Sequence, residues 1–108
     1  MTIIKNLPKI SLQNNLKSMN KLPVLYIKPS CPWCVSALDY FKAKGVRLDI
    51  RDVIASPAEM KQMVKVSGQS KCPTFQHGDA IKADFSVEEF TDWAKSKPSV
   101  CSEIGLKP

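Results

Sequence analysis

The sequence predicts an α/β fold with the element order β-α-β-α-β-β-α, in which four strands form one mixed sheet flanked by helices. Two observations lead to this prediction. Short β-prone runs alternate along the chain with segments of helical spacing, and two Ser-x-x-Glu capping boxes, at Ser56 and Ser86, mark helix starts. Because a helix joins the first two strands, we expect them to pair in parallel through a right-handed crossover.

The first half of the domain reads as strand, helix, strand. Val24–Lys28 is an apolar run typical of a buried strand. Pro32 fits the first turn of the next helix, because the N–H that proline lacks has no partner there, and Gly45 is suited to end that helix. The apolar positions with helical spacing are Trp33, Ala37, Leu38 and Phe41. Residues 46–50 then alternate between apolar and polar side chains, which predicts a second strand.

The second half begins with a helix and continues with a hairpin. Ser56 begins this helix and Gly68 ends it. Its predicted apolar face consists of Met60, Met63, Val64 and Val66. Residues 74–76 and 80–82 read as short strands, and the Gly-Asp pair at 78–79 favours a tight turn between them.

One further helix and two terminal segments complete the organisation. Ser86 begins the last helix, and Pro98 ends it. Its predicted buried face consists of Val87, Phe90, Trp93 and Ala94. We expect three regions: a basic N-terminal extension (1–21) with a short helix at Ser11–Met19, a folded domain (22–98) and a C-terminal tail without regular structure (99–108).

The net charge of +6 is distributed unevenly along the 108 residues. Residues 1–22 contain four lysines and no acidic residue, whereas the remaining 86 hold 12 basic and 10 acidic side chains. The basic leader lacks arginine and interleaved aromatic residues, which favours a solvated extension over a segment that binds nucleic acid or anionic lipid. No apolar run reaches the roughly 20 residues that cross a bilayer, and no secretory leader is recognisable. We therefore expect a cytoplasmic monomer with neither nucleic acid nor membrane as a partner.

The stretch that carries chemistry is a Cys-Pro-Trp-Cys motif, residues 31–34, where the first strand gives way to a helix. At a helix start, unpaired N–H groups and the positive end of the helix dipole favour a thiolate. Two cysteines three positions apart on one helical turn can form a disulfide with little movement. We expect Cys31 to be the nucleophile, with the Lys28 charge favouring its thiolate. Cys34 is then the more buried, resolving thiol.

The four cysteines fit other roles less well. They are Cys31, Cys34, Cys72 and Cys101. A secreted disulfide scaffold would have denser cysteines and a leader. A zinc site would need a second Cys-x-x-Cys or a pair of histidines, and His77 is the only histidine in the sequence. Inert packing does not account for a Pro-Trp pair between two cysteines directly after a strand.

The motifs together resemble those of glutaredoxins, a family within the thioredoxin superfamily. The resemblance rests on residues 26–34 (Tyr-Ile-Lys-Pro-Ser-Cys-Pro-Trp-Cys), 67–74 (Ser-Gly-Gln-Ser-Lys-Cys-Pro-Thr) and 84–90 (Asp-Phe-Ser-Val-Glu-Glu-Phe). It implies a thioredoxin-like fold and a glutathione-dependent thiol–disulfide oxidoreductase that reduces protein disulfides or glutathionylated proteins. Glutathione would be a co-substrate, with no bound cofactor and no metal.

The resemblance also implies a substrate groove beside the two thiols. In that family the proline corresponding to Pro73 is cis and faces the Cys-x-x-Cys motif. Cys72, which precedes it, would offer its backbone N–H and C=O to the bound peptide. The family usually has threonine here, so Cys72 places a third thiol near the other two, which we expect to be a neutral substitution that lines the groove. Pro32 and Trp33 complete this part of the expected glutathione site.

Two charged ends of glutathione have implied partners as well. Lys28 would meet the glycyl carboxylate. The γ-glutamyl carboxylate would reach the start of the last helix, at Phe85 and Ser86, where a free helix N-terminus suits an anion. The family commonly has Gly-Gly just before this helix, whereas this chain has Ala83 and Asp84. These side chains narrow the groove, and an inward-facing Asp84 would repel the carboxylate.

Two other functions are consistent with the same residues. One is a thioredoxin-like reductant of a specific protein partner that works without glutathione, and the Ala83-Asp84 departure favours it. The other is a module in which Cys31, Cys72 and an external thiolate hold an iron–sulfur cluster or a soft metal. The bulky Pro-Trp pair between the cysteines disfavours a bridged cluster.

Overall fold

The fold is known from a computed structural model, which describes residues 22–108. Its elements are β1 (Val24–Ile27), α2 (Pro32–Ala43), β2 (Asp49–Asp52), α3 (Pro57–Ser67), β3 (Thr74–His77), β4 (Ala80–Ala83), α4 (Val87–Lys95) and α5 (Pro98–Ile104). The predicted order β-α-β-α-β-β-α is confirmed, and α5 follows it. The N-terminal extension 1–21 and the helix expected at Ser11–Met19 lie outside the described residues.

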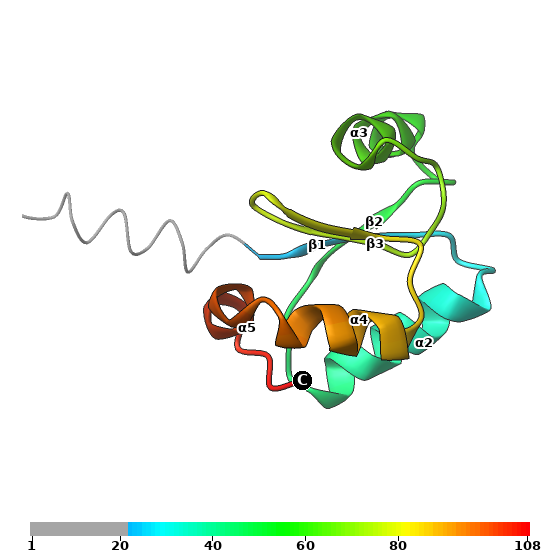
Figure 1. The fold of residues 1–108 in the computed structure, drawn as a ribbon. Helices are drawn as coiled ribbons and strands as arrows, with labels where there is room; N and C mark the ends of the chain where they lie inside the picture. Colours follow the sequence, from blue (N-terminus) through cyan, green and yellow to red (C-terminus); the bar gives the residue numbers. More distant parts are fainter. Residues whose placement is uncertain (1–21) are drawn as a thin grey trace, which may run out of the picture.

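The four strands form one mixed sheet in the order β2-β1-β3-β4. β1 pairs in parallel with β2, across the crossover helix α2, while β3 pairs antiparallel with both β1 and β4. Figure 1 shows the sheet edge-on, with α3 on one face and α2 and α4 on the other. This arrangement is the predicted thioredoxin-like fold.

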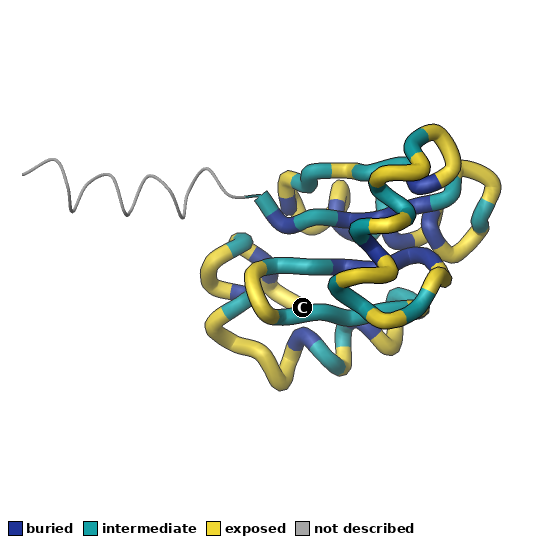
Figure 2. Tube along the Cα trace, turned by 90° about the horizontal axis from the view of Figure 1, so that it is seen from above, coloured by how far each residue is buried: buried dark blue, intermediate teal, exposed yellow. Residues whose placement is uncertain are grey.

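An aromatic cluster fixes α2 and α4 on the sheet. Phe41 of α2 and Phe90 of α4 both pack on Phe75 of β3, with ring centroids 5.8 and 5.0 Å away. All three side chains are almost fully buried, and Figure 2 shows such buried segments alternating with exposed ones along the tube. Burying each large apolar side chain contributes about 1.5–3 kcal/mol. The cluster therefore fixes the C-terminal half of α2 and the middle of α4 against the sheet.

Helix α2 begins directly after Cys31, which is its N-cap residue, and Pro32 is its first helical residue. The helix buries Cys34, Ala37 and Phe41. Trp33, which has helical spacing with these residues, is 59% exposed and lies outside the buried face. With 3.6 residues per turn, the position three before Ala37 faces the core, and that position is Cys34.

The second strand lies at Asp49–Asp52, three residues later than the predicted 46–50. The N–H of Asp49 donates to the carbonyl of Pro23 at 2.8 Å, so pairing with the β1 segment begins there. Val46 is buried although it precedes the strand. The alternation of apolar and polar side chains therefore reflects burial in the loop before the strand as well as in the strand, and it does not mark where the strand begins.

Helix α3 departs from the prediction at two points. The hydroxyl of Ser56 accepts a hydrogen bond from the N–H of Glu59 at 3.4 Å, but the Glu59 carboxylate binds Arg51 at 3.2 Å instead of closing the capping box. Met63 is fully buried as predicted, whereas Val64 is 41% exposed. Met60 and Val66 pack against the core and complete the face that α3 turns to the sheet.

The hairpin and α4 agree with the prediction. β3 and β4 each extend one residue beyond the predicted ranges, and Gly78 adopts the left-handed conformation (φ 61°) that the tight turn requires. On α4, Phe90 and Ala94 are buried, while Val87 and Trp93 are half-buried.

The C-terminal residues form helix α5 rather than the expected tail. Pro98 ends α4 but also occupies the first position of α5, where proline is well tolerated. Gly105, with φ 74°, ends α5 in the left-handed conformation. A helix of seven residues is too short for its apolar positions to establish a period, so the sequence pattern could not reveal it.

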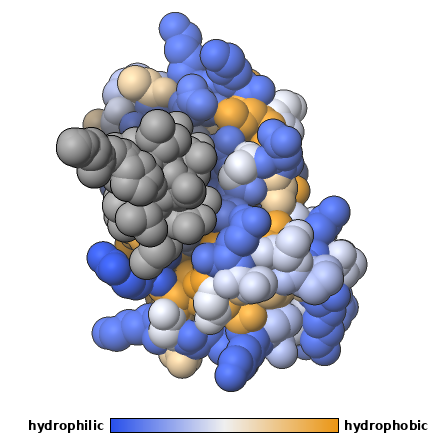
Figure 3. Space-filling view, turned by 90° about the vertical axis from the view of Figure 1, so that its left-hand side faces the viewer, coloured by the Kyte–Doolittle hydropathy of each residue, from blue (hydrophilic) through white to orange (hydrophobic). Residues whose placement is uncertain are grey.

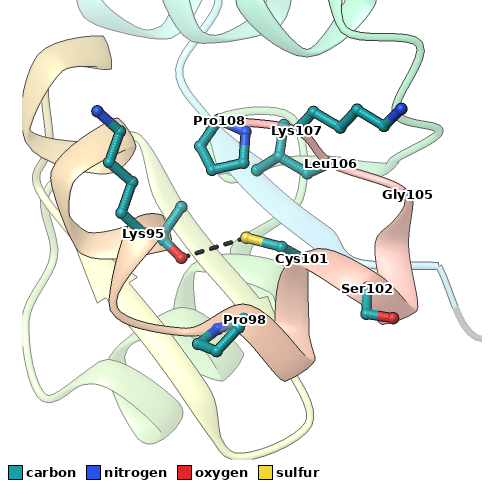
Figure 4. Close-up of a pocket in the computed structure, with 9 residues that line it drawn as sticks. Lys95, Pro98, Cys101, Ser102, Gly105, Leu106, Lys107 and Pro108 are labelled. Atoms are coloured by element: carbon teal, nitrogen blue, oxygen red, sulfur yellow. Dashed lines mark hydrogen bonds between the residues drawn. The ribbon is translucent and has the colours of Figure 1, made fainter.

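Helix α5 packs on α4 and on the end of β3. The Cys101 thiol is buried and donates to the carbonyl of Ala94 at 3.2 Å, the bond marked in Figure 4. Leu106 is also buried, and His77 Nε2 lies 2.8 Å from Glu103 Oε1. The same helices and the C-terminal residues enclose a largely apolar hollow of about 540 Å³, with Lys95 and Lys107 at its rim.

Polar side chains dominate the face drawn in Figure 3, with apolar ones showing between them. Among residues 22–108, no helix has the length and apolar character needed to cross a membrane.

Candidate active site

Cys31 lies at the junction between β1 and α2. Its N–H donates to the carbonyl of Lys28 at 3.0 Å, and its carbonyl accepts from the N–H groups of Cys34 and Val35 at 3.0 and 3.1 Å. Its side chain makes no capping bond, and the residue is only partly buried. The sulfur is therefore accessible at the positive end of a 12-residue helix, where a thiolate is favoured.

Cys34 has the opposite environment. It is only 1% exposed, and its sulfur accepts a hydrogen bond from the backbone N–H of Lys28 at 3.4 Å. Burial raises the pKa of the Cys34 thiol to about 12, the hydrogen bond from Lys28 opposes this, and the neighbouring Cys31 thiol adds to it. Cys34 is thus held as a neutral thiol beside a more accessible one, as predicted for the resolving position.

The backbone of Cys72 lies close to the Cys31 sulfur. The Cys72 carbonyl oxygen lies 3.9 Å from Cys31 Sγ, and the Cys72–Pro73 peptide bond is cis, as the family resemblance implied. The strand β3 begins at the next residue, Thr74, whose fully buried side chain donates to the carbonyl of Lys71 at 2.8 Å. These contacts hold the Cys72 backbone beside the nucleophile.

The thiol of Cys72 points into the core. It is buried and lies 3.7 Å from the sulfur of Met63 on α3. Burial raises the pKa of Cys72, while the positive charge of Lys28 lowers it. A neutral thiol packed on a methionine fits the expectation of a neutral substitution, and its redox role stays a prediction.

Lys28 serves this site through two different groups. Its backbone N–H binds the Cys34 sulfur, and its ammonium charge is close enough to act on Cys72. The side chain is half-buried at the end of β1. It therefore supplies positive charge beside the thiols, and its contact with a glycyl carboxylate stays a prediction.

Two of the N–H groups at the start of α4 are bonded within the chain itself. The N–H of Ser86 donates to Glu89 Oε1 at 2.9 Å, and the Ser86 hydroxyl accepts from the N–H of Glu89 at 3.1 Å, which completes a capping box. Phe85 is only 3% exposed, so its side chain packs in the core. The Ser86 N–H is therefore occupied and the Phe85 side chain is buried, and their contact with glutathione stays a prediction.

Asp84 lies between β4 and α4 and contacts the cis-proline. Its N–H donates to the carbonyl of Pro73 at 2.9 Å, and it has a positive φ of 51°, which aspartate tolerates better than most residues. Its carboxylate is exposed and lies 3.9 Å from the ammonium of Lys71. The backbone of Asp84 is thus hydrogen-bonded directly to the cis-proline.

The structure brings Lys28, Cys31, Cys34 and the Cys72–Pro73 bond together, as predicted. Pro32 and Trp33 lie beside them and are exposed, so they are available to a ligand. Two features of the site were not predicted. Glu89 occupies the Ser86 N–H, which the Ser-x-x-Glu signature itself indicates. The sulfur of Met63 contacts the Cys72 thiol, which no spacing rule predicts.

All four cysteines of the chain are free thiols. Within residues 22–108, no group of three or more His, Cys, Asp or Glu side chains is arranged to hold a metal ion.

The fold and the paired thiols define a class: a thioredoxin-like domain with a Cys-x-x-Cys pair at the start of its first described helix. A model of the glutaredoxin family matches residues 24–79, about half of the chain. The chain therefore belongs to the glutaredoxin family.

The chain is also similar to other proteins of known sequence or structure. An uncharacterised glutaredoxin-like protein from the rubredoxin operon of Clostridium pasteurianum is 29% identical over 65 residues, which are 60% of this chain and 87% of that protein. The crystal structure of a buckwheat glutaredoxin–glutathione complex is similar in fold, with a TM-score of 0.62, 22% identity and coverage of 89% of this chain and 94% of that one. A glutaredoxin from Archaeoglobus fulgidus has a TM-score of 0.60, 19% identity and coverage of 72% and 91%.

Proposed function

We propose that this protein is a dithiol thiol–disulfide oxidoreductase in which Cys31 attacks and Cys34 resolves. The observation that carries the proposal is the contrast between the two thiols. Cys31 is accessible at the helix start, whereas Cys34 is 1% exposed and its pKa is raised to about 12. A partly exposed thiol at a helix start and a buried, protonated thiol one turn later are suited to successive steps of one exchange.

The exchange would proceed in two steps. The Cys31 thiolate attacks one sulfur of a substrate disulfide, so that a mixed disulfide forms and the other substrate sulfur leaves as a thiolate. Cys34 then loses its proton, to the leaving thiolate or to water, and attacks Cys31 Sγ. The Cys31–Cys34 disulfide forms, and the second substrate sulfur leaves, so the substrate gains the two electrons that the protein loses.

The backbone of Cys72 would position the substrate. Its carbonyl lies 3.9 Å from Cys31 Sγ, so a peptide that pairs with Cys72 as an added strand would bring its disulfide to the nucleophile. Recognition through the backbone of the protein and of the peptide tolerates many substrate side chains.

Glutathione is the co-substrate that the family membership favours. Lys28 supports this because it places a positive charge beside the thiols, where a carboxylate would be attracted. The similar buckwheat glutaredoxin has been solved in complex with glutathione. Glutathione would then attack the mixed disulfide on Cys31 in place of Cys34, or reduce the Cys31–Cys34 disulfide after each turnover.

A second candidate is a reductant of a specific protein partner that works without glutathione. The observation that favours it is the closed capping box, in which Glu89 already occupies the Ser86 N–H. A carboxylate arriving there would have to compete with Glu89. The two candidates share the chemistry of Cys31 and Cys34 and differ in what returns the protein to its reduced state.

Two cysteine variants and two substrates test the proposal. Cys31→Ser should abolish the reduction of both a protein disulfide and a glutathionylated protein. Cys34→Ser should lose the first reaction but keep the second when glutathione is supplied, because glutathione can resolve the mixed disulfide. Activity that survives in Cys31→Ser would refute the assignment of the nucleophile. Reduction of the protein disulfide by wild type without a matching glutathione reaction would favour the second candidate.

A further inference from the structure

We propose that the apolar hollow between α4, α5 and the C-terminal residues is a binding site for a small amphipathic anion, a molecule with an aliphatic chain and one carboxylate. The aliphatic chain lies against the apolar lining, and the carboxylate lies at the rim near Lys95 and Lys107. This site is separate from the paired thiols and does not depend on the proposed exchange.

The hollow has the size and lining of a ligand site. Its volume is about 540 Å³, within the range of roughly 300–1,000 Å³ that is usual for small-molecule pockets. Ala94, Cys101 and Leu106 form its floor, and Pro98 adds an apolar wall. The three residues of the floor belong to the hydrophobic core. An aliphatic chain placed there therefore extends the core outward, and each methylene that leaves water adds to the affinity.

Polar groups at the floor of the hollow are already paired within the chain. The thiol of Cys101 donates to the carbonyl of Ala94 at 3.2 Å, and the carbonyl of Cys101 accepts from the N–H of Leu106 at 2.8 Å. An apolar chain that covers these groups leaves none of them without a partner, so it meets no desolvation penalty there. The floor therefore favours an aliphatic occupant over one that is polar throughout.

The charge around the hollow favours an anion. Residues 94–108 contain three lysines and one acidic residue, Glu103, and Glu103 does not line the hollow but lies 2.8 Å from His77 on β3. The ion pairs within residues 22–108 involve neither Lys95 nor Lys107, and both lysines are exposed. Their ammonium groups are therefore available to the carboxylate of a ligand.

The lysines and the apolar residues are separated in the way that such a ligand requires. In Figure 4 the ammonium ends of Lys95 and Lys107 lie toward one side of the view, Pro98 and Ser102 lie toward the other, and Cys101 is between them. Long lysine side chains can cover apolar surface with their stems while the charged end stays in water. A single charged end on an aliphatic chain matches this distribution.

The hollow lies far from the paired thiols. Asp84, which precedes α4, is bonded to Pro73 in the candidate active site, whereas Lys95 is the last residue of α4. A rise of 1.5 Å for each of its nine residues separates the two ends of α4 by about 13 Å. Figure 1 likewise shows α5 at the end of α4 away from the start of α2. Occupancy of the hollow should therefore leave the exchange by Cys31 unchanged.

The test uses octanoate as the probe and octan-1-ol as its uncharged counterpart with the same chain length. Backbone amide shifts in NMR spectra of the reduced, isotope-labelled full chain give the location and the dissociation constant of each. Octanoate should shift the amides of residues 95–107 and saturate at about millimolar concentration. The rate of thiol–disulfide exchange, measured with saturating octanoate, should equal the rate without it.

Lysine variants test the charge of the ligand. Lys95→Met and Lys107→Met each remove one charge and keep an apolar stem, so each should weaken octanoate about two- to five-fold, the size expected of one exposed charge. Both should bind octan-1-ol as wild type does. Lys97→Met makes the same change at an exposed lysine that does not line the hollow, and it should alter neither affinity. Unchanged octanoate affinity in both Lys95→Met and Lys107→Met would overturn the anionic class of ligand.

Tryptophan variants test the hollow itself. Ser102 lines it, so Ser102→Trp should fill it and largely abolish the binding of both probes. Ser99→Trp makes the same change at an exposed position of α5 that does not line the hollow, and it should bind both probes as wild type does. Unfolding midpoints check that both variants keep the fold.

Three results would overturn the site. The first is the absence of octanoate-induced shifts in wild type, or shifts centred on residues 28–34 instead of 95–107. The second is equal binding by the two tryptophan variants. The third is binding of the chain to vesicles of anionic phospholipid without binding of free octanoate, because the surface would then recognise a membrane rather than a single aliphatic acid.

Discussion

The backbone N–H of Lys28 donates a hydrogen bond to the sulfur of Cys34 across 3.4 Å. The end of β1 is thereby joined to the first turn of α2 through the inner cysteine. The same residue binds Cys31 through its carbonyl, at 3.0 Å. The main chain of one residue at the strand end therefore binds both the Cys34 thiol and the Cys31 backbone, and any residue other than proline would supply the same groups.

Raising the pH should destabilise the reduced protein through Cys34. Burial raises the pKa of Cys34 from an ordinary value of 9.0 to about 12. Because the folded-state pKa is the higher one, the stabilisation is complete below about pH 9 and is lost as the pH rises toward 12. Urea unfolding midpoints of wild type should fall more steeply over this range than those of Cys34→Ala, which has no thiol to titrate there. Equal slopes would contradict the burial of a protonated thiol.

Lys28→Ala should weaken reactions with anionic substrates and spare the thiol geometry. The variant keeps the backbone bonds to both cysteines and loses only the positive charge. A charge-assisted hydrogen bond to a carboxylate is worth roughly 1–2 kcal/mol, so the Michaelis constant for a glutathionylated substrate should rise by about ten-fold. Reduction of an uncharged disulfide is the control: any loss there measures the effect of the Lys28 charge on the Cys31 thiolate, and the loss with the glutathionylated substrate should be larger. An unchanged Michaelis constant for the glutathionylated substrate would show that Lys28 does not bind its carboxylate.

Mild oxidation should join Cys31 to Cys34 and leave Cys72 free. The Cys72 thiol packs against Met63 Sδ at 3.7 Å, and burial raises its pKa, so it is a poor nucleophile. Mass spectrometry after unfolding and alkylation should find the label on Cys72 and on Cys101. Cys72→Ala should keep the exchange activity of wild type. A substantial Cys31–Cys72 disulfide would instead identify a third redox-active thiol.

The two serine caps should differ in their contribution to stability. Ser86 takes part in a complete capping box with a 3.1 Å bond, whereas Ser56 accepts a longer bond, 3.4 Å, and its Glu59 partner binds Arg51. Replacing an N-cap serine by alanine costs about 1 kcal/mol on average. Thermal or urea unfolding should show a larger loss for Ser86→Ala than for Ser56→Ala, and the reverse order would contradict the observed geometry.

The sequence alone was sufficient to predict the elements whose sequence signals lie within a few residues of one another. The thiols, the helix that follows them and the Ser86 cap all depend on residues within one or two turns, and the structure places them as predicted. The family resemblance added the cis bond before Pro73, which no local pattern of this chain would have distinguished from an ordinary turn.

The parts that could not be predicted depend on distant partners. Glu59 has the right spacing for a capping box, but Arg51 on β2 competes for its carboxylate. The second strand starts where the segment before β1 offers a partner, at Pro23, and not where the alternation starts. Trp33 keeps helical spacing with the buried residues, yet the orientation of α2 turns it outward. In each case a tertiary contact overrides a correct local pattern.

The packing of α5 has a practical consequence for where the chain can be shortened. Cys101 and Leu106 are part of the hydrophobic core, and Glu103 is bonded to His77 at the end of β3. An expression fragment that stops at residue 98, where the sequence pattern alone ends the folded domain, would leave one side of α4 and the end of β3 open to water. Such a fragment would lack part of the hydrophobic core. If it were less soluble or less active than the full chain, the truncated fold would be the cause, and the result would not show that the last residues act in catalysis.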